Sequence, residues 1–244
     1  MEAFAELFRL EAGHFWFRAR NQLIAWAMRR YFPDAKTALE IGCGTGFVLS
    51  HLEKTFPDIE LSGGEAYPEA LVFAASRLER AKLYQVDVRA LPFENEFDVI
   101  GAFDVLEHVP QDEEALAQIF KATRLGGGII LTVPQHRWLW SSADDIAHHV
   151  RRYTAEELRR KVANAGFEVV RSTSFVSALL PPMLLSRMMG GREESDERVQ
   201  REFEIAPPIG YAFEKVLAGE RALIRAGVSL PVGGSRLLVA RRTH

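Results

Sequence analysis

The sequence predicts an α/β fold in which a mostly parallel β-sheet is covered by helices on both faces. Short apolar runs alternate with amphipathic helical stretches across residues 37–133, and this alternation is typical of parallel strands joined by crossover helices. A glycine-rich turn also connects the first run directly to the helix that follows it. At 244 residues, the chain is long enough to bury a large core as one domain.

The predicted elements follow from periodicity and from helix end signals. Residues 1–34 are expected to be helical because apolar side chains recur every three or four positions until Pro33-Asp34. Strands are expected over residues 37–42, 59–64, 82–86, 97–103, 128–133, 167–173 and 235–241. Helices are expected after each of the first two strands and over residues 111–124 and 154–166.

The predicted domain has four parts along the chain. These are an N-terminal helical cap, a cofactor-binding core, a helical insertion and a last strand, over residues 1–34, 35–175, 176–233 and 234–244. The insertion is predicted because about 60 residues separate the last two strands, far more than a hairpin needs.

Composition excludes several classes of partner and compartment. The 30 Lys and Arg residues against 33 Asp and Glu give a net charge of -3, so no global positive field would attract nucleic acid. Cys43 is the only cysteine, which excludes an intrachain disulfide and a cysteine zinc cluster and fits a reducing, cytoplasmic location. Charges interrupt residues 1–10, and residues 175–189 are too short to span a membrane.

The turn at residues 40–46 reads Glu-Ile-Gly-Cys-Gly-Thr-Gly. Glycines there let the backbone turn tightly and approach a ligand without Cβ atoms in the way. A dinucleotide-binding turn would read G-x-G-x-x-G and hold a pyrophosphate, whereas here the third glycine comes one residue earlier. S-adenosylmethionine has no phosphate and therefore matches this turn better, although a tight strand-to-helix turn without a ligand would also explain the glycines.

Two acidic residues at successive strand ends favour the cofactor interpretation. Glu65 ends the second strand, where its carboxylate can accept hydrogen bonds from ribose hydroxyls. Asp87 ends the third strand, where a carboxylate can accept the adenine amino group. Each residue alone could be a loop acid, but together they indicate a nucleoside site.

With these blocks in place, the sequence resembles the class I S-adenosylmethionine-dependent methyltransferases, in particular the methyltransferase type 11 or UbiG-like group. The matching blocks are residues 39–46, 64–65, 87–93, 97–109 and 126–134. The resemblance implies a Rossmann-like, doubly wound, seven-stranded sheet with an antiparallel last strand. It also implies that S-adenosylmethionine, with S-adenosylhomocysteine as product, is bound by Glu40, Gly42, Gly44, Gly46, Glu65, Ala66, Asp87, Val88, Phe103, Asp104 and Leu106.

Two further blocks resemble segments found in a subset of this family. In the first, Trp16 and Arg20 match a Trp-Phe-x-x-Arg pattern and are expected to bind the cofactor, whose carboxylate could pair with the Arg20 guanidinium. An amphipathic helix with solvated arginines is the alternative. In the second, after the fifth strand, His149, Arg152 and Tyr153 match a segment that can reach the mouth of the cofactor cleft and would bind the substrate.

Transfer of an activated methyl group mainly requires a nucleophile held in line and shielded from water. His149 and His108 are the candidate catalytic bases because imidazole titrates near neutral pH; a reaction without a side-chain base is the alternative. No metal site is predicted, because Asp145, His148 and His149 are nearly consecutive and no separate ligand cluster is evident.

The sequence therefore predicts an S-adenosylmethionine-dependent methyltransferase that acts on an O, N or C nucleophile of a small, apolar or lipid-linked acceptor. The acceptor class is suggested by the Met-rich, apolar insertion, which would suit a greasy substrate and peripheral membrane contact. Packing as a lid or as a homodimer contact explains the same residues. An NAD(P)-binding oxidoreductase and a non-catalytic cofactor-binding protein are the rival functions.

Overall fold

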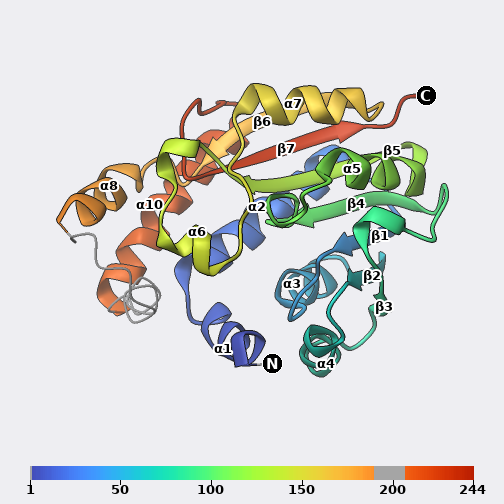
Figure 1. The fold of residues 1–244 in the computed structure, drawn as a ribbon, viewed down its shortest axis with the longest axis horizontal. Coiled ribbons are helices and arrows are strands. Elements are labelled where there is room, and N and C mark those ends of the chain that lie inside the picture. The colour runs from blue at the N-terminus through green and yellow to red at the C-terminus, as the bar shows by residue number, and fades with distance from the viewer. Residues whose placement is uncertain (1, 190–206) are drawn as a thin grey trace.

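The computed structural model describes residues 2–189 and 207–244. Seven strands form one sheet in the order β3-β2-β1-β4-β5-β7-β6, and its helices lie on both faces (Figure 1). The strands are β1 (Thr37–Ile41), β2 (Glu60–Glu65), β3 (Lys82–Gln85), β4 (Phe97–Phe103), β5 (Thr123–Pro134), β6 (Glu168–Phe175) and β7 (Ser235–Arg241). Strand β7 runs antiparallel to both of its neighbours, β5 and β6, as the resemblance implied, so the predicted fold class is confirmed.

The two faces of the sheet bury alternate residues of the same strands. Ala38 and Ile130 belong to the core cluster on the face covered by α2 (Phe15–Tyr31), α3 (Phe47–Thr55) and α10 (Pro207–Arg225). Leu39 and Ile129 point into the opposite cluster, beneath α5 (Asp112–Ala122) and α7 (Ala155–Asn164). Because neighbouring strand residues face opposite sides, the central strands are apolar throughout, as both-sided coverage requires.

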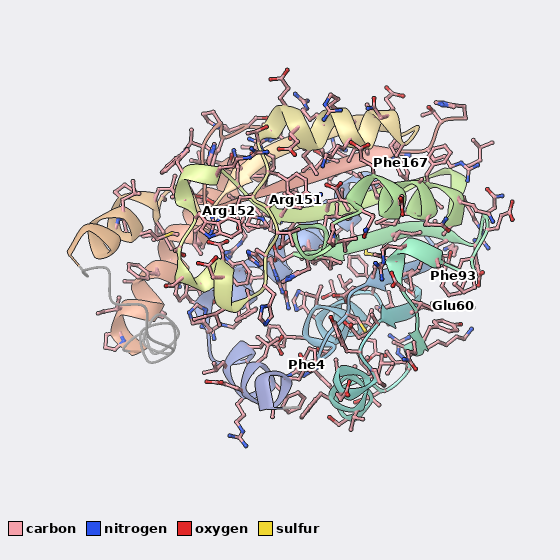
Figure 2. The ribbon with its side chains drawn as sticks, viewed as in Figure 1. Phe4, Glu60, Phe93, Arg151, Arg152 and Phe167 are labelled. Atoms are coloured by element: carbon pink, nitrogen blue, oxygen red, sulfur yellow. The ribbon has the colours of Figure 1, made fainter. Side chains whose placement is uncertain are left out.

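The predicted N-terminal helix is two helices. Helix α1 (Glu2–Glu11) ends before Gly13, and α2 then begins with the His14 side chain accepting a hydrogen bond from the Trp16 amide. Helix α1 packs on α4 (Pro68–Arg77) through Phe8 and Phe73, whose ring centroids are 5.4 Å apart. Figure 2 labels Phe4 on the same helix. The continuous apolar periodicity concealed this break because both helices bury an apolar stripe, although on different neighbours.

The insertion is helical where the structure describes it. It contains α8 (Leu180–Met189) and α10, while residues 190–206 lie outside the described residues. Phe213 of α10 packs against Phe15 of α2 with ring centroids 5.4 Å apart, and Leu217 is buried. The Glu220 carboxylate accepts the backbone N–H groups of residues 176–178 at 2.6–2.8 Å. Part of the apolar insertion is therefore used in packing on α2.

Strand β5 begins earlier than the sequence indicated. Its first residue, Thr123, pairs with Phe97, and the register then shifts before Gly128 pairs with Val99. The glycines of residues 126–128 hid this first part, since glycine is unfavourable in strands. In the part of the chain that the structure describes, the remaining helical segments are α6 (Ser142–Ile146) and three short 3₁₀ helices, η1 (Val88–Ala90), η2 (Leu106–His108) and η3 (Arg137–Leu139). None of the described helices is long and apolar enough to cross a bilayer.

Candidate active site

The turn between β1 and α3 has the backbone geometry that its glycines suggested. Gly42, Gly44 and Gly46 have φ angles of 65°, 51° and 76°, in the left-handed region that favours glycine. A Cβ at Gly42 would lie 2.5 Å from a methyl group of Val105, whereas a Cβ at Gly44 would meet no atom within 4 Å. Gly44 therefore borders open space from which a ligand can approach the main chain.

Glu65 is held against this turn. Its carboxylate accepts hydrogen bonds from the Gly44 amide at 2.9 Å and from the Tyr67 amide at 3.1 Å. Asp87 lies at the neighbouring strand end and accepts the Arg89 amide at 2.9 Å. The Arg89 side chain also pairs with Asp87 and lowers the pKa of its carboxyl group. Both predicted nucleoside-binding acids thus lie at the carboxyl ends of adjacent strands, followed by exposed Ala66 and buried Val88.

Glu40, at the end of β1, is buried beside the turn. Its Oε2 atom has no hydrogen-bond partner within the described residues. Burial raises the pKa of Glu40 well above its usual value, against the opposing effect of the Arg20 charge. An unpartnered buried oxygen beside a turn with open space fits a site that receives a polar or cationic ligand group.

Arg20 reaches the same region from α2. Its guanidinium pairs with the Asp104 carboxylate and lies over the Trp16 ring, 4.7 Å from the ring centroid. Asp104 has a φ of 57°, an uncommon conformation for a residue other than glycine. The structure thus brings three predicted cofactor residues together at the end of β4. Phe103 is also buried, while the Leu106 side chain is fully buried in the core cluster under α5, so that only its backbone can contribute to the site.

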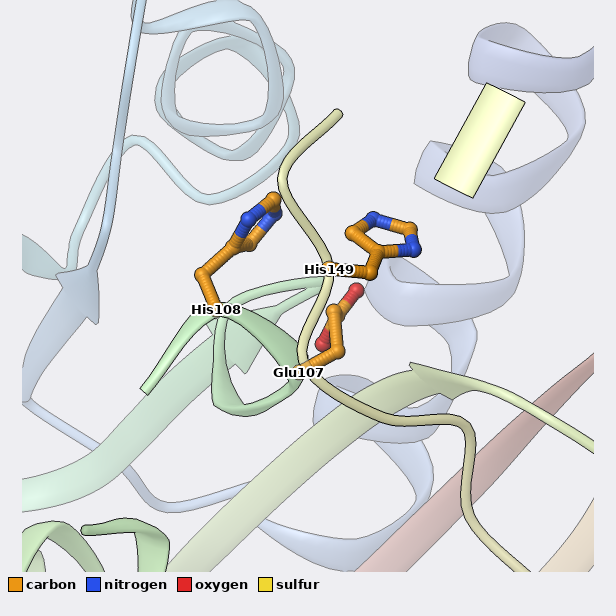
Figure 3. A group of neighbouring side chains, drawn as sticks. All are labelled: Glu107, His108 and His149. Carbon is orange, nitrogen blue, oxygen red and sulfur yellow. The ribbon is translucent and has the colours of Figure 1, made fainter. Parts of the chain in front are cut away.

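His108 and His149 come together from two separate segments. His108 belongs to η2 after β4, His149 belongs to the loop after α6, and their ring centroids are 4.7 Å apart (Figure 3). The Val150 amide donates to the Glu107 carbonyl at 2.8 Å, which fastens the two segments to each other. Burial, followed by the nearby His149, lowers the pKa of His108. Both predicted catalytic residues therefore lie in one cluster.

Asp144 orients His149 and is itself held by Arg152. The His149 Nδ1 atom lies 2.8 Å from Asp144 Oδ1, and Arg152 donates to both carboxylate oxygens at 2.7 and 2.9 Å. Burial alone would raise the pKa of Asp144, but the hydrogen bonds from His149 and Arg152 outweigh it and lower the pKa to about 2. Figure 2 labels Arg152 and its neighbour Arg151 on the segment before α7. In this structure, the predicted substrate residue Arg152 therefore pairs with Asp144.

Tyr153 lies in the core. It is fully buried, and its hydroxyl donates to the Asp112 carboxylate at 2.6 Å. The structure therefore places this predicted substrate residue in the core, where its hydroxyl also donates to the Leu106 carbonyl at 3.2 Å. The motif match did not indicate that the Tyr153 side chain faces the core, because neighbouring loop residues can face opposite directions.

Three residues to which the sequence assigned no role also belong to the site or brace it. Glu107 adjoins His108, and Asp144 lies five positions before His149 in a segment that already matched the family. Glu11 accepts hydrogen bonds from the Thr45 hydroxyl at 2.5 Å and from Arg77 at 2.7 Å, which ties α1 to the glycine turn. Acidic residues within the matched blocks were the available signal, but the partners of Glu11 lie 34 and 66 residues away in the sequence.

Comparisons with known proteins show the family to which this chain belongs. A family model described as a methyltransferase domain matches residues 8–172, more than half of the chain. A trans-aconitate 2-methyltransferase of Azoarcus sp. (strain BH72) is 26% identical over 148 residues, which cover 61% of this chain and 55% of that protein. An amino-sugar N,N-dimethyltransferase of Streptomyces venezuelae, acting on dTDP-3-amino-3,4,6-trideoxy-alpha-D-glucopyranose, is 31% identical over 131 residues, covering 50% and 54%.

A solved structure extends the likeness to the whole fold. Phosphoethanolamine N-methyltransferase 2 of Haemonchus contortus, in complex with S-adenosyl-L-methionine, superimposes with a TM-score of 0.61 at 18% identity, covering 92% of this chain and 53% of that one. This chain spans about half the length of the curated relatives it matches. The chain belongs to the methyltransferase domain family, which confirms the family predicted from the sequence.

Proposed function

We propose that this chain transfers the methyl group of S-adenosylmethionine to an oxygen or nitrogen nucleophile of a small molecule. The observation that carries the proposal is the position of the His108–His149 pair beside the glycine turn. Strand β1 pairs with β4, and Val105, just before η2, touches the turn at Gly42. Catalytic imidazoles at this place would lie on the side from which an acceptor meets the methyl group.

The donor would occupy the turn. Gly44 would admit its amino-acid portion, Glu65 would accept hydrogen bonds from its ribose, and Asp87 would contact its adenine. Arg20 has a planar donor fork suited to the donor carboxylate, while its ion pair with Asp104 and the Trp16 ring hold it in place. The donor itself supplies a methyl group already activated by the positive sulfur. The protein's task is to orient the two molecules and exclude water.

His149 and His108 would act on the acceptor. Asp144 fixes the orientation of the His149 ring. The segment that delivers His149 also exposes apolar side chains, with 58% of Trp138, 38% of Trp140 and 43% of Ile146 accessible. These side chains support an acceptor with an apolar part, as do the exposed Ile209 and Tyr211 of the insertion. The named relatives act on small molecules.

Incubation with methyl-labelled S-adenosylmethionine tests this function. Small-molecule fractions of a cell extract, aqueous and organic, would be added separately, and we expect label in a small molecule that is absent with His149→Ala. Label in protein or RNA would contradict the acceptor class. Absence of any labelled product, with S-adenosylhomocysteine still bound, would favour the non-catalytic alternative.

A further inference from the structure

Glu107 is a buried carboxylate that its surroundings leave unsatisfied. The residue has no exposed surface, and neither carboxylate oxygen has a hydrogen-bond partner within the described residues. Leaving such a group unpaired in the interior costs free energy, which a bound cation or donor would recover. The imidazoles of His108 and His149 lie next to the Glu107 carboxylate (Figure 3).

Together, Glu107, His108 and His149 form the Glu-His-His cluster. Each offers one ligand atom, and the three atoms lie within 4.8 Å of one another. Donors around a single metal ion, each at about 2.0–2.2 Å from it, are separated by less than this distance, so that modest side-chain rotation would complete the site. Two imidazoles and one carboxylate are a donor set used by zinc and other first-row transition metals.

The surroundings of His149 match those of a metal-binding histidine. Such histidines characteristically donate their second ring nitrogen to a carboxylate, which fixes the tautomer and the ring orientation. Here Nδ1 of His149 meets Asp144 at 2.8 Å, leaving Nε2 available as a ligand. Asp144 is anchored in turn by Arg152 and by the Ser141 amide at 2.8 Å. The Glu-His-His cluster thus has an oriented ligand as well as a suitable donor set.

We propose that the Glu-His-His cluster binds one divalent transition-metal ion of the zinc type, and that an oxygen of the methyl acceptor occupies an open coordination position. The second half of this proposal rests on the proposed function. A metal would lower the pKa of the acceptor hydroxyl, whose proton leaves to solvent. The oxygen then forms a bond to the methyl carbon while the carbon–sulfur bond breaks and its electron pair stays on sulfur, giving S-adenosylhomocysteine.

This proposal differs from what the sequence indicated for metals. Asp145, His148 and His149 are nearly consecutive and made a poor local ligand set. Folding instead joins His149 to Glu107 and His108, which belong to a different segment. His148 is exposed and has a φ of 55°. It provides a matched control next to the cluster, and asparagine is the suitable replacement because it tolerates this backbone conformation.

Metal binding can be measured without donor or acceptor. The full chain would be stripped with a chelator and titrated with Zn²⁺ by calorimetry and with Co²⁺ by visible absorption. We expect one ion per chain, at least 100-fold weaker binding for His108→Ala, His149→Ala and Glu107→Gln, and unchanged binding for His148→Asn. Asp144→Asn should weaken binding about 10- to 100-fold through loss of ring orientation.

Circular dichroism and S-adenosylhomocysteine binding would show that each variant is folded. Metal stoichiometry unaffected by the three ligand changes, or lost in His148→Asn, would overturn the proposal. Absence of metal binding together with a turnover defect in His149→Ala would overturn the metal site and leave the proposed function standing with His149 as a base. Metal binding without any labelled product would leave the site standing and contradict the proposed function.

Discussion

Two parts of the site lie at the same edge of the sheet and are built in opposite ways. The cofactor edge consists of residues 42–46, Glu65 and Asp87, which follow β1, β2 and β3 and depend on backbone conformation and single acids. The Glu-His-His cluster depends on side chains from two distant segments, fastened by one backbone hydrogen bond and braced by Asp144. We infer that the first part binds the donor independently of the second, so that binding and turnover should be separable by mutation.

The largest effect is expected from His149→Ala. Turnover should fall about 10²- to 10⁴-fold, because the variant loses the imidazole that Asp144 orients. Binding of S-adenosylhomocysteine should stay within about twofold, since no part of the cofactor edge changes. Initial rates with labelled donor, together with calorimetry, measure both quantities. A comparable loss of turnover in His148→Asn would contradict the role of His149. A large loss of S-adenosylhomocysteine binding in His149→Ala would contradict the independence of the two parts.

Gly44→Val should instead weaken cofactor binding, because it changes the cofactor edge and not the Glu-His-His cluster. The new side chain would project into the open space beside the turn and weaken binding of S-adenosylhomocysteine by roughly 100-fold, or about 2.7 kcal/mol. The left-handed backbone at this position should also cost about 1–2 kcal/mol of stability, which a folded domain can tolerate. Calorimetry and thermal melting check the two effects. Unchanged affinity would remove the turn from the cofactor site.

Arg20→Lys should produce an intermediate effect because Arg20 would contact the donor carboxylate without belonging to the glycine turn or to the Glu-His-His cluster. The variant keeps the charge but loses the planar fork and its stacking on Trp16. We expect binding of S-adenosylhomocysteine to weaken about tenfold and Asp104→Asn to have a smaller effect. Equal affinity in Arg20→Lys and the wild type would indicate that this arginine serves only to hold Asp104.

Glu53→Gln should leave both parts intact and change only stability. The Glu53 carboxylate accepts the backbone N–H groups of Glu79, Arg80 and Ala81 at 2.6–3.1 Å. Burial alone would raise the pKa of Glu53, but these hydrogen bonds outweigh it and lower the pKa. Loss of the charge should cost about 1–2 kcal/mol at pH 7.

The sign of the pH dependence follows from the lowered pKa of Glu53. Its contribution is fully present above the unfolded value of about 4.3 and is lost as the pH falls through the lower folded value. The difference in melting temperature between wild type and Glu53→Gln should therefore shrink below pH 4. A difference that grows on acidification would contradict the assigned role.

The contrast between the two parts also explains what the sequence could predict. The predicted limits of β4 and β7 agree with the structure because the apolar runs of these strands are bounded by polar turns. The cofactor edge was predictable because each residue follows its own strand, and parallel strands end at the same edge. The position of Asp144 and His149 near Glu107 depends on how the loop after α6 folds over η2, and no local spacing encodes it. The inward direction of Tyr153 was hidden for the same reason.

Titration of the wild-type chain with S-adenosylhomocysteine and, separately, with NAD⁺ tests most directly whether the cofactor edge is a methyl-donor site. Isothermal calorimetry should show one molecule of S-adenosylhomocysteine bound per chain and no binding of NAD⁺. Binding of NAD⁺ in place of S-adenosylhomocysteine would contradict the assignment of the turn, Glu65 and Asp87.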